Sequence, residues 1–114
     1  MVDVVTGVAA FRANEAWDGK RIAILGDTRT DLLWADKPFH WHVNSVDELF
    51  VVLNGRVDMR YRDTTGEHRV GLETGDMMVI RKGEQHVATP EGEVRLLIVA
   101  SPADKDDYWF RTPD

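Results

Sequence analysis

Residues 39–55 read FHWHVNSVDELFVVLNG, and this stretch decides the fold that the sequence predicts. Its second half is an apolar run that ends in Asn54-Gly55, and another β-rich run follows directly. Asn-Gly between two such runs indicates a hairpin with a two-residue turn. Pairing across that turn puts a largely apolar set on one face, namely Phe50, Val52, Val57, Met59 and Tyr61, with Glu48 at its end.

The apolar face is the expected core side, so Glu48 should point inward. A carboxylate in a core costs several kcal/mol unless it is paired or bound to a metal. His40 and His42 are two residues apart and would share one face of a strand. If that face is also the interior, the three polar groups need a common partner, and a divalent cation would supply one. Ordinary alternatives are that the histidines are half-exposed strand residues and that Glu48 contacts Arg60 or Tyr61.

In the rest of the chain, turn residues recur every eight to twelve positions, and no long stretch has apolar residues at helical spacing. This pattern predicts an all-β sandwich or closed barrel. A helix start is expected at residues 101–104, before a Tyr108-Trp109-Phe110 tail that would fold back on the barrel. The strands are expected at residues 20–25, 28–34, 40–43, 48–53, 56–62, 67–72, 77–80, 86–89 and 94–100, with a weaker one at 4–11.

Composition narrows the class of protein. The 114 residues contain no repeat and predict a single domain, 1–114. A net charge of −6 argues against nucleic acid or an anionic membrane as partner. There is no cysteine, so metal ligands would be His, Asp or Glu. No apolar run is long enough for a membrane helix, and the acidic N-terminus is unlike a secretion signal, so we expect a cytoplasmic protein.

Two motifs in the chain resemble those of the cupin superfamily, proteins of double-stranded β-helix (jelly-roll) fold. The first motif, G-x5-H-x-H-x3–4-E-x6-G, is matched over residues 40–55 by His40, His42, Glu48 and Gly55. The second, G-x5-P-x-G-x2-H-x3-N, is matched over residues 75–90 by Gly75, Gly83 and His86. The resemblance therefore implies a single cupin domain.

The first motif departs from the pattern, because five residues separate His42 from Glu48 where the motif has three or four. Asp47 stands at the standard spacing, but the register turns it away from Phe50 and Val52, so Glu48 is preferred. The leading glycine of the first motif is also absent, as are the proline and asparagine of the second; Trp34, Arg81 and Pro90 stand there.

The resemblance implies one divalent transition metal ion (Fe, Mn, Ni, Co, Cu or Zn) held by His40, His42, Glu48 and His86. Three imidazoles and a carboxylate do not select among these metals. His68 lies outside both motifs and is expected to be structural or exposed.

The implied function is that of a metal-dependent enzyme acting on a small organic molecule by dioxygenation, isomerisation or decarboxylation. The alternative is a non-catalytic module that binds or senses such a molecule. Tyr61 and Gln85 are candidate catalytic residues. The expected pocket walls are Phe50, Met59, Met78 and Trp34, with no cationic anchor inside, so a partly apolar substrate is expected; Arg81 and Lys82 are expected to be solvated.

The apolar outer face of the predicted barrel indicates a homodimer. Leu49, Val51 and Leu53 form an apolar row there, and residues 94–100 are apolar on nearly both faces. A barrel strand with solvent outside should alternate, so something must cover this face. The N-terminal strand or the aromatic tail would cover part of it, and a second subunit the rest.

Overall fold

The computed structural model describes residues 1–103, and residues 104–114 lie outside the description. Within the described residues the chain forms one 3-10 turn, η1 (Val8–Ala10), and eight strands. These are β1 (Asp18–Leu25), β2 (Thr28–Ala35), β3 (Asp47–Asn54), β4 (Arg56–Asp63), β5 (Gly66–Glu73), β6 (Met77–Ile80), β7 (Gln85–Pro90) and β8 (Val94–Ser101).

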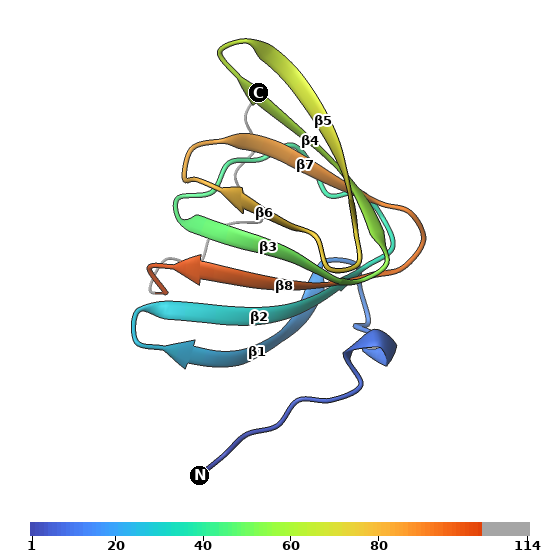
Figure 1. Cartoon of the computed structure of the whole chain (residues 1–114), viewed down its shortest axis with the longest axis vertical. Helices are drawn as coiled ribbons and strands as arrows, with labels where there is room; N and C mark the ends of the chain where they lie inside the picture. The colour runs from blue at the N-terminus through green and yellow to red at the C-terminus, as the bar shows by residue number, and fades with distance from the viewer. Residues whose placement is uncertain (104–114) are drawn as a thin grey trace.

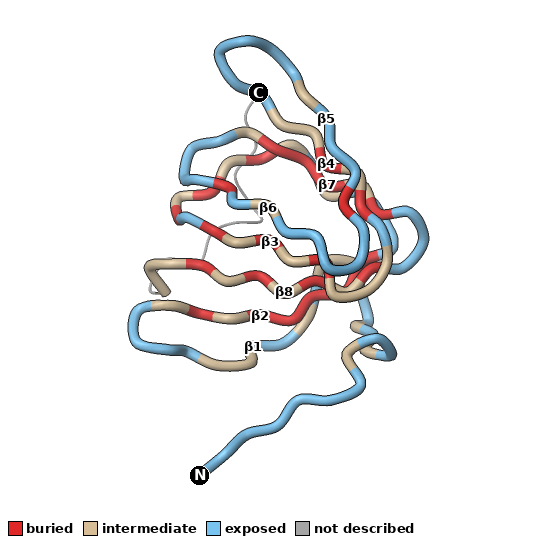
Figure 2. The backbone as a smooth tube through the Cα atoms, in the orientation of Figure 1, coloured by how far each residue is buried: buried red, intermediate tan, exposed pale blue. Residues whose placement is uncertain are grey.

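The strands form two antiparallel sheets around a common interior. One sheet has five strands in the order β1-β2-β8-β3-β6, and the other has three in the order β5-β4-β7. Figure 1 shows the two sheets curving toward each other, and Figure 2 shows buried segments recurring along their strands. The core between them includes Val52, Val57, Met59, Leu96 and Ile98, all at most 2% exposed. The prediction of an all-β jelly-roll fold is confirmed.

The hairpin predicted at Asn54-Gly55 is wrong. β3 pairs with β8 and β6, whereas β4 pairs with β5 and β7, so the chain passes between the sheets at this point. Gly55 has a φ of 108°, and a Cβ there would lie 2.6 Å from the Glu93 carbonyl oxygen, so only glycine fits. Its amide donates to the Thr74 hydroxyl at 3.0 Å instead of to a neighbouring strand.

The faces deduced from that hairpin are nevertheless correct. Phe50, Val52, Val57 and Met59 are all buried, at 4% exposure or less. The reason is that β3 and β4 belong to two different sheets that face one common interior. The side chains that would share one face of a hairpin share the interior instead.

Two other predicted strands are not formed. Residues 1–7 form no strand and are exposed, and a strand at 4–11 is replaced by η1. Residues 40–43 contribute only an isolated bridge at His42. The Tyr108-Trp109-Phe110 tail lies outside the described residues. In the described part of the chain, no helix has the length and apolar character needed to cross a membrane.

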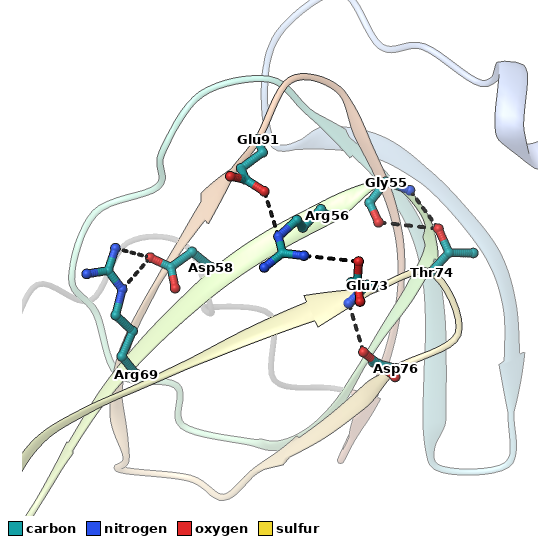
Figure 3. Close-up of polar contacts among 8 residues, drawn as sticks. All are labelled: Gly55, Arg56, Asp58, Arg69, Glu73, Thr74, Asp76 and Glu91. Carbon is teal, nitrogen blue, oxygen red and sulfur yellow. Dashed lines mark hydrogen bonds and ion pairs between the residues drawn. The ribbon is translucent and has the colours of Figure 1, made fainter.

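The outer face of the three-stranded sheet is covered with ion pairs (Figure 3). Arg56 contacts Glu73 at 3.0 Å and Glu91 at 2.6 Å. Arg69 contacts Asp58 at 2.6 Å. Such exposed pairs add little stability. They do show that Arg56 of β4 and Arg69 of β5 face outward.

The outer face of the five-stranded sheet is different, because it carries an apolar patch over β6, β3 and β8. Register places Leu49 between Val79 and Val99. Two of the patch residues are strongly exposed, Met77 at 61% and Val79 at 53%. We call this surface the outer apolar patch; it consists of Leu49, Val51, Met77, Val79, Leu97 and Val99.

We expect a second copy of the chain to cover the outer apolar patch, because two-fold pairing lets one apolar surface cover itself. Val79→Glu would place a carboxylate in that interface and should convert a dimer to a monomer at micromolar concentration, as measured by light scattering. Ile24→Glu, at a β1 position that is 55% exposed and outside the patch, is the matched control and should leave the mass unchanged. A monomeric parent protein would contradict this expectation.

Candidate functional site

His42 and His86 are placed by one bridge between their backbone segments. The amide of each donates to the carbonyl of the other, and both N–O distances are 3.1 Å. Directly opposed residues of an antiparallel pair point to the same side. The two rings accordingly lie with their centroids 4.1 Å apart, and both residues are buried.

Both rings are held through Nδ1. The Nδ1 atom of His42 lies 2.9 Å from the His40 carbonyl oxygen, and that of His86 lies 3.0 Å from the Glu84 carbonyl oxygen. A carbonyl oxygen only accepts, so each Nδ1 carries a proton and donates it. Each neutral ring therefore keeps its lone pair on Nε2. Metal-binding histidines are typically fixed in this way.

Glu48 completes a group of three. Its side chain is buried, and its Oε1 lies 3.7 Å from Nε2 of His86, which is beyond hydrogen-bonding distance. The neighbouring Asp47 is exposed and accepts a hydrogen bond from the Lys82 amide at 3.0 Å. The prediction that Glu48 and not Asp47 faces the interior is confirmed.

Burial moves the pKa values of this group in opposite directions. Desolvation raises the pKa of Glu48 to about 7, and the neighbouring Asn44 amide and Arg29 only partly oppose the shift. Desolvation, followed by the proximity of His86, lowers the pKa of His42 to about 3. Desolvation also lowers the pKa of His86. Both rings are therefore neutral at pH 7, which is the form that ligates metals.

The structure does not bring His40 into this group. His40 is exposed, and its ring stacks on Phe39 with a centroid distance of 4.1 Å. The segment before His42 is not an extended strand, and Phe39 lines the interior in its place. Among residues 1–103, no three His, Asp or Glu side chains are arranged to hold a metal ion as they stand. The four-ligand set that the resemblance implies is therefore not assembled.

The three site residues line a small inner pocket with a volume of about 30 Å³. That is the space of about one water molecule. A larger outer chamber of about 500 Å³ adjoins it and shares Trp17, Leu33 and Phe39 with it. A cavity of that size suits a small organic ligand. The remaining walls of the inner pocket are apolar: Phe50, Ala88 and Ile98.

Tyr61 and Gln85 do not line the inner pocket. Tyr61 is the cross-strand partner of His86, but it lines a separate hollow, and its ring stacks on His68 at 5.1 Å. Gln85 faces outward, where its Oε1 accepts a hydrogen bond from Arg62 at 3.3 Å. Thus His68 has a structural contact, and of the two candidate catalytic residues only Tyr61 shares a hollow with a site residue, His86.

The expected pocket walls are only partly found. Phe50 lines the inner pocket, and Met78 lines the hollow beside His86. Trp34 lies on the other side of β2, where its indole N–H donates to Glu93 at 3.0 Å and Arg12 stacks on its ring. Trp34 is therefore not a pocket wall, because the alternation of β2 turns Leu33 inward instead.

Sequence reasoning missed buried charges on the inner side of the five-stranded sheet. Arg29 is 0% exposed and lies 3.5 Å from Asp31, which is 4% exposed and is also hydrogen-bonded to Arg21. Arg29 acts on Glu48, as the pKa of that carboxyl shows. The prediction that the interior holds no cationic group is wrong. Residues 28–31 alternate threonine with charge, so polarity alone could not reveal which set faces inward.

The chain belongs to the cupin family: the family model "Cupin domain" matches residues 34–100. Among solved structures, it is similar to a cupin-2 domain protein from Shewanella frigidimarina, with 29% identity and a TM-score of 0.69. That match covers 78% of this chain and 84% of the other. No curated protein matches the sequence.

Two further structures share the fold alone. A double-stranded β-helix protein from Klebsiella pneumoniae has 14% identity and a TM-score of 0.71, covering 92% of this chain and 95% of the other. A variant of oxalate decarboxylase from Bacillus subtilis has 14% identity and a TM-score of 0.67. This last match covers 75% of the present chain but only 24% of the decarboxylase.

The raised pKa of Glu48 predicts a specific pH dependence of stability. Between the ordinary value of 4.5 and about 7, the folded form binds more protons than the unfolded form, so Glu48 costs stability as the pH rises through this window. Glu48→Gln removes that penalty, which is at most roughly 3 kcal/mol.

The melting temperature of Glu48→Gln relative to the parent, both in chelator, should therefore be higher at pH 8 than at pH 5. The histidines titrate in both proteins and cancel in the difference. A difference that stays constant from pH 5 to pH 8 would show that Glu48 titrates normally.

Proposed function

We propose that this cupin binds one divalent transition metal ion in the inner pocket and acts as a metal-dependent enzyme on a small organic molecule in the outer chamber. The observation that carries the proposal is the pairing of two cavities. An ion-sized pocket lined by His42, Glu48 and His86 adjoins a chamber large enough for a ligand. Dioxygenation, isomerisation and decarboxylation all suit such an arrangement.

The chemistry of the donor set supports a metal, although its three side chains would have to shift to hold one. Nε2 of His42, Nε2 of His86 and the Glu48 carboxylate would hold the ion, and imidazole with carboxylate suits Fe, Mn, Co, Ni, Cu or Zn. A cation would also compensate the desolvated Glu48 carboxylate. When bound, the ion would polarise a substrate carbonyl or lower the pKa of a bound water.

The outer chamber suits a molecule with an apolar and a polar part. Trp17 and Phe39 stand at its junction with the inner pocket, and their ring centroids are 5.4 Å apart. Trp17 has a φ of 70°, and its indole N–H is fixed on the Lys37 carbonyl at 2.8 Å. The two rings would orient the apolar part and exclude water from the inner pocket. Charged side chains around the chamber, Glu15, Asp18, Lys20, Arg21 and Asp31, would face the polar part.

Metal content tests the ion site. His42→Ala and His86→Ala should each lower the affinity for Mn²⁺ or Zn²⁺ by more than about tenfold, because even an outer partner of a metal ligand is worth that much. Asp47→Ala is the matched control, since it removes a neighbouring carboxylate that faces outward. Elemental analysis and calorimetric titration make the comparison. Equal metal binding by all three variants would contradict the ion site.

A non-catalytic binding or sensing module is the second candidate. One observation favours it: in the described part of the chain, the inner pocket is lined by no titratable side chain apart from His42, Glu48 and His86. Tyr61, a candidate catalytic residue from the sequence, lines a neighbouring hollow that it shares with His86. Turnover would then depend on the ion and on groups of the outer chamber such as Asp31.

Turnover distinguishes the two functions. The metal-loaded protein should consume oxygen or form product with a member of a panel of phenolic and keto-acid compounds, and His42→Ala should abolish this. Thermal stabilisation by a compound without any turnover would instead support the binding module. The cytoplasmic location stays a prediction.

A further inference from the structure

The inner surface of the barrel contains a polar residue that has no role in the site so far. From His42 to Val52, every second residue is buried and every residue between is not. The inward series is His42, Asn44, Val46, Glu48, Phe50 and Val52. His40 precedes the series and is exposed. Asn44 is therefore the polar side chain that lies between His42 and Glu48 on the inner surface.

The spacing of the first motif agrees with this placement. One residue separates His42 from Asn44, and three separate Asn44 from Glu48. The motif has one residue between its two histidines and three or four before its glutamate. If the motif starts at His40, its second histidine is His42, and five residues separate His42 from Glu48, which is outside the pattern. Starting it at His42 removes the departure and puts asparagine where the pattern has histidine.

The state of the Asn44 side chain also points to a ligand. Asn44 is 2% exposed, and neither its Oδ1 nor its Nδ2 makes a hydrogen bond of normal geometry. Burying an amide whose polar atoms make no well-formed hydrogen bond costs stability. Its backbone carbonyl accepts the Gly83 amide at 2.9 Å, which ties this segment to the loop that leads to His86.

We propose that Asn44, which is buried on the inner surface between His42 and Glu48 but does not itself line the inner pocket, supplies the remaining ligand in place of a third histidine, and that His40 takes no part. The proposal rests on the metal-binding function proposed above. The site then consists of two imidazoles, one carboxylate and one amide oxygen, supplied by His42, His86, Glu48 and Asn44.

This composition has a consequence for the choice of metal. Amide and carboxylate oxygens suit Mn²⁺ and other hard cations, whereas imidazole suits Zn²⁺, Cu²⁺ and Ni²⁺. Replacing one imidazole by an amide should therefore weaken binding of the imidazole-preferring ions more than binding of Mn²⁺. Asn44 is in this sense a residue that determines metal specificity.

The test is a calorimetric titration of the chelator-treated, full-length protein with Zn²⁺ and with Mn²⁺, supported by thermal shift. Asn44→His should tighten Zn²⁺ binding by at least about tenfold, and Asn44→Ala should weaken Mn²⁺ binding by about the same factor. His40→Ala is the matched control and should bind both ions like the parent. If Asn44→His does not fold, Asn44→Asp, which is equal in size to asparagine, should tighten Mn²⁺ binding instead.

The outcomes separate this proposal from the proposed function. Loss of metal binding in His40→Ala, or unchanged binding in every Asn44 variant, would overturn the role of Asn44 while leaving a metal-dependent function in place. If the parent binds neither ion, the metal-dependent function and the role of Asn44 as a ligand both fail, even where Asn44→His gains Zn²⁺ binding. If neither the parent nor any Asn44 variant binds an ion, both are overturned.

Discussion

The structure depends on the strict alternation of inward and outward residues from His42 to Val52. Because β3 lies in one of two sheets that enclose a common interior, its inward side chains are buried and must pack or find polar partners. The deep end of the series is apolar and joins the core through Phe50 and Val52. Its other end is polar and carries His42, Asn44 and Glu48. One periodic segment thus builds both the core and most of the candidate site.

The corner at Gly55 shows what alternation can and cannot predict. Alternation of side chains alone assigned four residues to the interior, and that assignment holds: Phe50, Val52, Val57 and Met59. Alternation could not predict which strands pair with each other, because a hairpin at Asn54-Gly55 and a crossing between sheets there put the same residues inside. The distinction lies in contacts remote in sequence, such as the close approach of the Glu93 carbonyl to Gly55. A local turn pattern carries no information about those.

The candidate site was predictable where a polar residue interrupts an apolar face, as Glu48 does. It was not predictable where polar residues stand among other polar residues. The prediction that His40 faces inward assumed that residues 40–43 form a strand. In the structure, Phe39 lines the inner pocket and His40 does not. Arg29 and Asp31 are buried within a run that has no apolar face to orient it. The inward position of Asn44 was not predictable either, since asparagine is typical of turns.

We expect the inner pocket to offer two imidazoles to a bound ion, those of His42 and His86, and His40 to stay outside. Pulsed electron paramagnetic resonance on the Cu²⁺-loaded protein tests it most directly, because imidazole nitrogens coupled to the copper can be counted. We predict two coupled imidazoles in the parent and two in His40→Ala. Three imidazoles in the parent, with one lost in His40→Ala, would contradict it.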